Sequence, residues 1–316
     1  MNERTALLPK PPVPGATRRT HLKDRLIERG LLGVASLTIV FLFLILLFLI
    51  QRSLPAIQEV GLREFLTGTR WMPSSRNPGY GAFAMIFSSV MVAAGALVLS
   101  APWGVGVAVF VSELAPKALK EVLKPTVETL AIFPSVVIGF VGLVVVAPRL
   151  ASLLGLSHGL TALTGIIMLS IMALPTIISI SEDAINSVPR EYKEAAYALG
   201  ATKTETILRV TLPAARSGIS AAIMLGFGRA IGETMTLLMV AGNALSLPIT
   251  HVFGIPVPNL LASVRTLTAT IAIEGLDVPW RSLHFHSLFV LGGILFTFTF
   301  VVNLIADIVL HKWEVK

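Results

Sequence analysis

One pair of charged residues stands inside an otherwise apolar stretch of the sequence. Arg229 and Glu233 lie four residues apart in the stretch 216–241, which carries no other charge after Arg216. Residues four apart share one face of a helix. A charge in the middle of a bilayer costs about 2.5–3.5 kcal/mol on insertion scales, so such side chains rarely face lipid. We therefore expect both residues to face protein or water.

Two interpretations of this pair are open. It is either a structural pair that fixes helix packing, or part of an aqueous path for an anion. A guanidinium group presents a forked set of donors that matches phosphate or carboxylate oxygens. In the second interpretation Arg229 helps the anion across, and Glu233 holds the arginine or keeps the anion from binding too tightly to leave. Asn243, just beyond, would line the outer mouth.

Gly228 and Gly232 flank the same arginine. The spacing G-x-x-x-G lets a second helix approach closely, so we assign these glycines to helix packing. A dinucleotide-binding loop would also be glycine-rich. It is rejected here because the glycines lie inside an apolar helix and follow no strand.

A second pattern lies in the polar segment 182–215. Ser187 and Pro189 are typical of a helix start, and Gly200 of a helix stop. Between them an apolar stripe repeats at helical spacing: Tyr192, Ala195, Ala196 and Leu199.

A second short helix follows in the same segment. Thr202 and Glu205 form a capping box that opens it, and Leu212-Pro213 is predicted to end it. Such a pair of helices fits docking into a groove of another protein. An amphipathic helix lying on lipid headgroups fits the same pattern equally well.

Several kinds of chemistry are excluded by what the sequence lacks. It has no cysteine, so no thiol nucleophile is possible, and no G-x4-G-K-[ST] loop, so this chain is not expected to bind ATP. His284 and His286 have no third ligand at a suitable spacing, which argues against a metal site. We expect no enzymatic activity, no cofactor and no metal on this chain.

The composition indicates what must position these residues. Of the 316 residues, 54% are hydrophobic and 14% are charged, and the mean hydropathy is +0.81. Soluble domains are about 25% charged. A soluble all-α protein would show polar helix faces, whereas these stretches are apolar all round. Six membrane spans are predicted, at 31–50, 82–111, 126–147, 160–181, 216–241 and 285–310.

The run 31–50 is read as a first transmembrane helix rather than a cleaved signal peptide. It is about twenty residues long and uncharged, and no small-x-small cleavage site follows it. It would follow a tail at 1–30 and precede an outer loop at 51–81. The segment 82–310 would form a five-helix core that contains the loop 182–215. A short helix is expected within 259–274, and a second tail at 311–316.

The net charge of +7 is mainly a signal of topology. Of the 25 Lys and Arg residues, 17 lie in segments on the side of the two termini and 7 in the opposite loops. The positive-inside rule then places both termini in the cytoplasm. A nucleic-acid-binding protein would instead gather its basic residues on one face.

The loop 182–215 resembles the "EAA" loop of permease subunits of bacterial ABC importers. The family pattern is E-A-A-x3-G-x9-I-x-L-P, matched here by Glu194-Ala195-Ala196, Gly200 and Leu212-Pro213, with Val210 in place of the isoleucine. The resemblance implies that this loop couples the permease to a separate ATP-hydrolysing subunit, which would hold the ATP and Mg²⁺.

Further segments are similar to the phosphate-specific (Pst) permeases. They are Ser112–Pro116, Phe133–Gly139, Gly228–Met235, Ser287–Phe289 and Asn303–Ala306. The Trp71-x-Pro73 outer loop and the intact run Gly228–Thr234 are most like the C subunit. The resemblance implies an all-α permease of the type I importer (MetI-like) architecture with six transmembrane helices.

The resemblance also implies a function and a set of partners. The chain would be the permease subunit that imports inorganic phosphate across the bacterial inner membrane. It would pair with a second, homologous permease, a dimer of ATP-binding subunits inside and a phosphate-binding protein outside. The alternatives are a permease for sulfate or molybdate, a membrane-embedded regulatory subunit and, more remotely, an ion channel.

Overall fold

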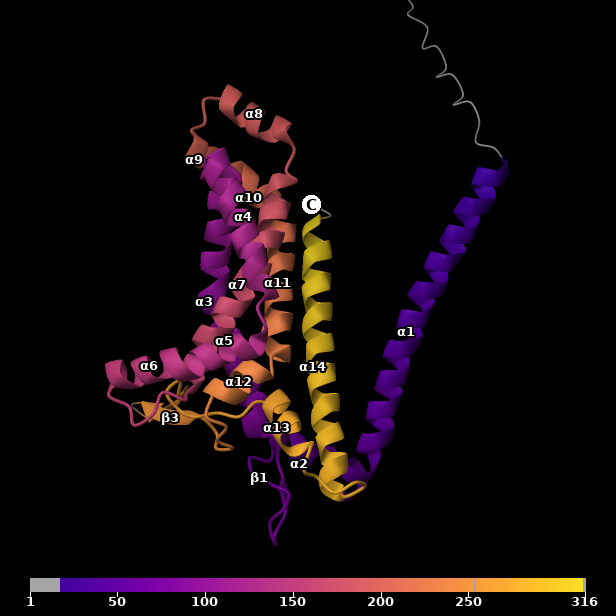
Figure 1. Cartoon of the computed structure of the whole chain (residues 1–316), viewed down its shortest axis with the longest axis vertical. Coiled ribbons are helices and arrows are strands. Elements are labelled where there is room, and N and C mark those ends of the chain that lie inside the picture. Colours follow the sequence, from indigo (N-terminus) through magenta and orange to yellow (C-terminus); the bar gives the residue numbers. More distant parts are fainter. Residues whose placement is uncertain (1–17, 253, 315–316) are drawn as a thin grey trace, which may run out of the picture. The chain divides into compact units, whose positions relative to one another are not determined.

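A computed structural model describes residues 18–252 and 254–314 of the chain (Figure 1). The chain divides after Gln51 into two units, and each is described by itself. The predicted tails at 1–30 and 311–316 lie outside the described residues over 1–17 and 315–316. The described residues of both tails are helical.

The described residues form helices and two short β-hairpins. The α-helices are α1 Arg18–Val60, α2 Leu62–Thr67, α3 Phe83–Val109, α4 Lys117–Ile132, α5 Ser135–Val141, α6 Ala147–Leu154, α7 Ala162–Asn186, α8 Arg190–Ala198, α9 Lys203–Thr206, α10 Leu212–Ala214, α11 Arg216–Gly232, α12 Met235–Val240, α13 Leu267–Glu274 and α14 Leu283–Glu314. The π-helical segments are η1 Phe110–Leu114, η2 Gly142–Val146 and η3 Ile207–Thr211. The strands are β1 Trp71–Met72, β2 Gly79–Tyr80, β3 Ile249–Val252 and β4 Ile255–Pro258.

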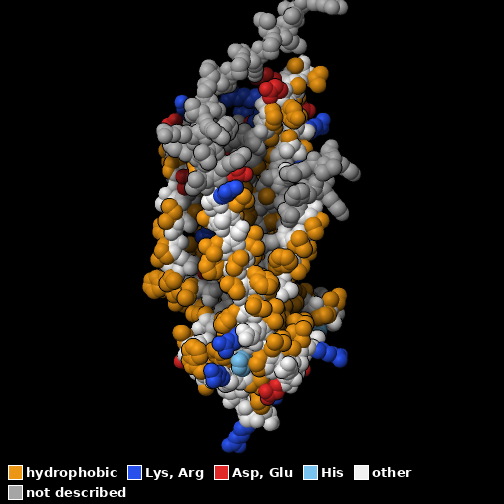
Figure 2. All heavy atoms as spheres, turned by 90° about the vertical axis from the view of Figure 1, so that its right-hand side faces the viewer, with side chains coloured by type: hydrophobic (Ala, Val, Ile, Leu, Met, Phe, Trp, Pro, Cys, Tyr) orange, Lys and Arg blue, Asp and Glu red, His pale blue; other side chains and the backbone are white. Residues whose placement is uncertain are grey.

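Within the described residues, five helical segments are long and apolar enough to cross a membrane: Ile27–Val60, Phe83–Leu114, Ser135–Leu154, Ala162–Asn186 and Leu283–Ile305. A sixth arises if Lys203–Ala214 and Arg216–Gly232, which meet at an angle of 69°, count as one span. This agrees with the prediction of six spans, although two of the predicted spans have the wrong limits. In Figure 2, hydrophobic side chains predominate along the middle of the face that is drawn, and charged side chains lie mainly toward its ends.

The predicted span 126–147 is wrong in its limits. The chain forms α4 up to Ile132, is extended at Phe133 with φ −58° and ψ 130°, and resumes as α5 at Ser135. Pro134 is the cause, because the residue before a proline is driven out of the helical region. Helix α4 packs along α7, whereas α5 and α6 run across the end of these helices (Figure 1).

The predicted span 216–241 is also wrong as one continuous helix. Helix α11 ends at Gly232, Glu233 is extended with ψ 127°, and α12 begins at Met235. The prolines in α3 and α7 do not end their helices, because both helices continue through Pro102 and Pro175. In membranes, neighbouring groups can satisfy the carbonyls that a proline leaves free.

The first unit exposes almost all of its described side chains. Residues 27–50 of α1 are uncharged after Arg29, and none of them is buried by the chain itself. An apolar helix of this length spans the hydrocarbon core of a bilayer. This part of α1 is therefore long and apolar enough to cross a membrane.

The second unit is built on α3, α7 and α11, which pack side by side. Gly226 of α11 allows a close approach, because a Cβ there would lie 2.7 Å from Cγ1 of Ile177 in α7. A middle core cluster joins these helices to α12, and a smaller cluster around Ile185 lies where α7 ends. Helix α14 packs against α11 and α13.

A third core cluster lies at the opposite end of the second unit. Phe65 of α2 and Trp71 of β1 are buried there against Leu291 of α14. The strands β1 and β2 pair antiparallel, as do β3 and β4. The predicted all-α fold contains neither hairpin. Each strand is only two to four residues long, which is too short to give a recognisable pattern in the sequence. The helix expected within 259–274 is shorter, beginning at Leu267.

Candidate functional site

Arg229 lies near the end of α11 and is exposed on the surface of the chain. Its Nη1 lies 3.4 Å from Oγ1 of Thr176 in α7, and its Nη2 lies 3.5 Å from the carbonyl oxygen of Ala131 in α4. Both contacts are longer than the usual 2.9–3.0 Å of such hydrogen bonds. The guanidinium group therefore keeps most of its donor capacity for another acceptor.

The expectation that Arg229 and Glu233 share one helix face is wrong. Because α11 ends at Gly232, the two side chains leave different segments, and within the described residues Arg229 forms no ion pair. The Glu233 carboxylate instead accepts a hydrogen bond of 3.1 Å from the backbone N–H of Thr236. It thus satisfies a free N–H at the start of α12, which is why the break is stable.

Two threonines that the sequence analysis did not single out hold this break. The hydroxyl of Thr236, which is buried, lies 3.1 Å from the carbonyl oxygen of Ser135 in α5. The hydroxyl of Thr268 in α13 donates to the backbone carbonyl of Glu233 at 3.0 Å. Isolated threonines in apolar runs give no pattern that points to such contacts.

Asn243 lies in the loop after α12, apart from Arg229. Its φ of 59° is left-handed, and its amide donates to the carbonyl of Leu238 at 2.7 Å. Its own carbonyl accepts from Nε of Arg265 at 3.1 Å. Its Oδ1 is buried with no partner among the described residues. The structure thus gives Asn243 a turn-forming position, and its predicted place at the outer mouth stays a prediction.

The two glycines assigned to helix packing differ in their surroundings. A Cβ at Gly228 would lie 3.7 Å from Oδ1 of Asn303 in α14, an ordinary contact, whereas a Cβ at Gly232 would meet nothing within 4 Å. The close approaches of α11 to α7 are made at Gly218 and Gly226. The surface at Gly232 is free for another chain or for the bilayer.

The predicted coupling loop forms α8, α9, η3 and α10. Helix α8 protrudes at one end of the second unit (Figure 1). Glu194, Ala195 and Leu199 are exposed, with Leu199 at 90% exposure, whereas Ala196 is buried. The predicted apolar stripe therefore faces away from the chain, apart from this one alanine.

The two boundaries inside this loop form as predicted. Gly200 has φ +83°, a conformation that only glycine adopts cheaply. Thr202 and Glu205 form both hydrogen bonds of the capping box. The hydrogen bonds from the Thr202 backbone and hydroxyl lower the pKa of the Glu205 carboxyl. The capping box therefore stabilises the loop above the ordinary pKa of a glutamate and is lost as the pH falls through the lowered value.

The helix predicted to end at Leu212-Pro213 ends one residue later, at Ala214, and the chain bends at Ala215. The loop therefore passes directly into α11, the helix that carries Arg229. A movement of the loop can reach Arg229 through α11, which follows this bend of 69°.

Ion pairs attach this loop to the helices beneath it. Nζ of Lys193 in α8 lies 2.5 Å from the carboxylate of Glu113 in η1. Glu182 of α7, whose side chain is 3% exposed, lies 3.6 Å from both Lys120 and Lys124 of α4. Burial would lower the pKa of Lys124, but the carboxylates of Glu182 and Asp183 outweigh it and raise the pKa. Lys124 therefore stays protonated at neutral pH.

Sequence comparison decides the family. The sequence model of the binding-protein-dependent transport system inner membrane component matches residues 100–315, about two thirds of the chain. The chain belongs to this family. The matched range begins within α3 of the permease and includes the coupling loop and the break after α11.

Relatives of the permease carry more specific names. A phosphate transport system permease protein PstC of Mesorhizobium japonicum is 34% identical over 95% of this chain and 93% of its own. A probable ABC transporter permease protein YqgH of Bacillus subtilis is 38% identical over 75% of this chain and 74% of its own. A PstC of Haemophilus influenzae is 32% identical over 89% of this chain and 90% of its own.

Solved structures confirm the fold of the permease. A chain of a bacterial ABC transporter that imports alginate aligns with a TM-score of 0.60 and 16% identity, covering 93% of this chain and 98% of that one. A chain of the MetNI methionine ABC transporter in an inward-facing conformation aligns with a TM-score of 0.52 and 16% identity, covering 74% and 94%. The permease thus has the MetI-like fold expected from the sequence.

Proposed function

We propose that this chain is the permease subunit of an ATP-driven importer that carries inorganic phosphate across the bacterial inner membrane. Phosphate transport permeases that are 32–34% identical over most of the chain support this substrate. The observation that carries the proposal is the position of Arg229, a guanidinium in an apolar helix with two long hydrogen bonds and no ion pair among the described residues.

The charge of the substrate explains why this arginine is needed. Inorganic phosphate carries between one and two negative charges near neutral pH, because its second ionisation falls in that range. A path lined only by hydrocarbon is closed to such an anion. Arg229 supplies a positively charged group along the path, and its donors match the phosphate oxygens. The hydroxyl of Thr176, 3.4 Å from Nη1, offers a further polar group on the same side.

ATP would act through separate subunits. This sequence has no phosphate-binding loop, so ATP and Mg²⁺ would bind to a dimer of ATP-binding subunits, and this chain would hold no cofactor. The exposed face of α8, with Glu194, Ala195 and Leu199, would seat in one of these subunits. Closure of the dimer would then move the loop and α11. Arg229 would thereby become accessible first from one side of the membrane and then from the other.

The remaining partners follow from the same architecture. A second, homologous permease would complete the path, and an extracytoplasmic phosphate-binding protein would deliver the anion. The distribution of basic residues supports a topology in which α8 and both termini would lie in the cytoplasm and the two β-hairpins outside. The exposed apolar surface of residues 27–50 fits the bilayer or the second permease.

Anion selectivity tests this proposal. The complete complex would be expressed in cells that lack their own phosphate importers, and uptake of radiolabelled phosphate, sulfate and molybdate would be measured. We expect ATP-dependent uptake of phosphate that excess sulfate or molybdate does not inhibit. Uptake of sulfate or molybdate instead would assign the permease to another oxyanion. ATP hydrolysis without uptake of any of the three would favour a regulatory subunit.

A further inference from the structure

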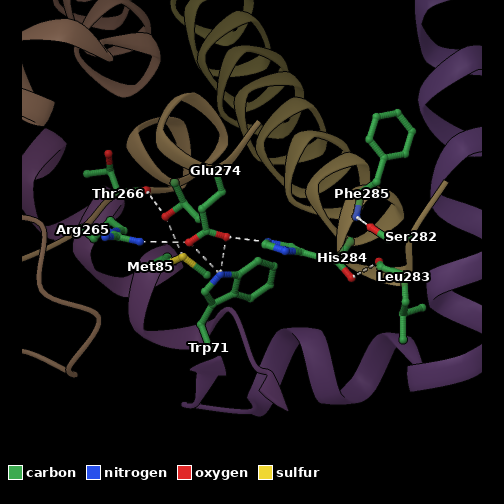
Figure 3. A network of polar contacts seen from close by, with 11 residues as sticks. Trp71, Met85, Arg265, Thr266, Glu274, Ser282, Leu283, His284 and Phe285 are labelled. Carbon is green, nitrogen blue, oxygen red and sulfur yellow. Dashed lines mark hydrogen bonds and ion pairs between the residues drawn. The ribbon is translucent and has the colours of Figure 1, made fainter. Parts of the chain in front are cut away.

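A carboxylate on the side of the molecule opposite α8 joins four separate segments (Figure 3). Glu274, the last residue of α13, accepts hydrogen bonds from Nε1 of Trp71 at 2.9 and 3.2 Å. Nη1 of Arg265 lies 3.0 Å from Oε1, and Nε2 of His284 lies 2.7 Å from Oε2. These residues come from the β1 strand, the segment before α13, α13 itself and the start of α14. We call them the Glu274 network.

The position of Glu274 is unfavourable by local rules. A negative charge at the C-terminal end of a helix opposes the helix dipole, which typically costs about 0.3–1 kcal/mol. The carboxylate is also largely buried, with 16% exposure. Its partners from three other segments compensate for this cost. Such a conflict between local preference and tertiary contacts is expected at functional sites.

Helix α13 connects this network to the break after α11. Its eight residues span about 12 Å at 1.5 Å per residue. Glu274 lies at its last residue, whereas Thr268 in its first turn donates to the backbone carbonyl of Glu233. The backbone N–H of Leu267 also donates to the hydroxyl of Ser89 in α3 at 3.0 Å. Helix α13 is therefore short and is fixed by hydrogen bonds to α3 and to the break after α11.

Arg265 provides a second connection. One of its nitrogens contacts Glu274, while Nε donates to the backbone carbonyl of Asn243 in the loop after α12. The network thus reaches both ends of α12, at Glu233 through α13 and at Asn243 through Arg265. Whenever α12 moves relative to α14, at least one of these contacts must break or rearrange.

We propose that Glu274 is a positioning residue that holds the outer side of the path closed, by fixing α12 and the break beside Arg229. The inference rests on the proposed function, because it assumes that the path opens and closes during transport. Weakening the Glu274 network raises the free energy of the outward-closed state relative to the outward-open state. Since a change of this kind shifts populations, the ATP-binding subunits then reach their closed, hydrolysing state without the binding protein.

The test compares two carboxylate-to-amide substitutions in the purified full complex. Glu274→Gln removes the charge that Arg265 and His284 face. Asp277→Asn makes the same change three residues later, at an exposed carboxylate for which no ion pair occurs among the described residues. ATP hydrolysis would be measured in lipid without binding protein and without phosphate, and anion uptake would be measured with both.

We expect Glu274→Gln to raise hydrolysis without binding protein by about fivefold or more, the lower end of usual coupling effects. It should also lower the number of anions imported per ATP, whereas Asp277→Asn should match the wild type. Wild-type hydrolysis and coupling in an assembled Glu274→Gln complex would overturn the proposal.

A second variant covers the case in which Glu274→Gln does not assemble. His284→Gln keeps a neutral donor within reach of the carboxylate and removes the imidazole that can carry a positive charge. It should give a smaller rise in the same direction, and an unchanged rate would overturn the proposal. Because hydrolysis is measured without any anion, an error in the assigned substrate leaves this result unaffected. A wild-type complex that hydrolyses no ATP would instead contradict the proposed function.

Discussion

Arg229 and Glu233 have separate roles in the structure, although they stand close together in the sequence. Arg229 keeps its donors available beside Thr176, and Glu233 satisfies the first turn of α12. In the proposed function, a negative carboxylate that is not paired with the arginine would weaken the hold on an anion. Release of the anion requires such a limit on its affinity.

Glu233→Gln should separate the two roles of this side chain. The amide oxygen still accepts from the N–H of Thr236, so we expect the complex to assemble with normal stability. Loss of the negative charge should leave the anion more tightly bound, which lowers both the KM for phosphate uptake and the maximal rate.

Glu233→Ala is the matched comparison for that prediction. It removes the charge and the acceptor together, so thermal unfolding of the complex should show a loss of about 1 kcal/mol, as for other helix caps. A KM for Glu233→Gln equal to that of the wild type would show that the charge has no part in anion release.

At the residue scale, the sequence predicts which residues matter better than it predicts their contacts. The cost of an intramembrane charge singles out Arg229 without any structure. The hydrogen bonds of Thr236 and Thr268 depend on segments far apart in the chain, Ser135 and Glu233 respectively. Tertiary packing alone brings these groups together, and no spacing in the sequence encodes it.

At the scale of elements, the coupling loop is the most directly testable part of the fold. Gly200 has φ +83°, and a Cβ there would meet nothing within 4 Å, so backbone conformation is the constraint on this position. The left-handed conformation is costly for a β-branched residue and tolerable for asparagine.

Gly200→Val should therefore distort the turn between α8 and α9 and detach the ATP-binding subunit. Co-purification of that subunit with the tagged permease measures the effect, and uptake should fall with it. Gly200→Asn is the control and should retain both. Normal co-purification and uptake with Gly200→Val would mean that this turn does not set the docking surface.

Local signals of helix ends explain which elements the sequence predicts. The capping box at Thr202 and Glu205 and the stop at Gly200 form as expected, because each depends on neighbours within a few residues. The sequence does not predict the break at Glu233, because no proline marks it and its stabilising contacts come partly from α5 and α13. Pro134 breaks its predicted span, whereas α3 and α7 continue through Pro102 and Pro175, so a proline alone does not predict a break.

At the scale of the whole molecule, composition already specifies a membrane protein with few charges. Of the charged residues, those in segments outside the spans mainly report topology. Among the charges in the membrane spans, Glu182 is paired to lysines of α4 and Glu233 satisfies the start of α12. Arg229 is left as the residue on which the transport account depends.

The most direct measurement is phosphate uptake by the reconstituted complex with Arg229→Gln. Loss of a charge-assisted contact worth about 1.5–3 kcal/mol predicts a fall in uptake of about tenfold to a hundredfold. Assembly and ATP hydrolysis should persist, and Arg229→Lys should recover part of the rate. Uptake at the wild-type rate by an assembled Arg229→Gln complex would contradict the account.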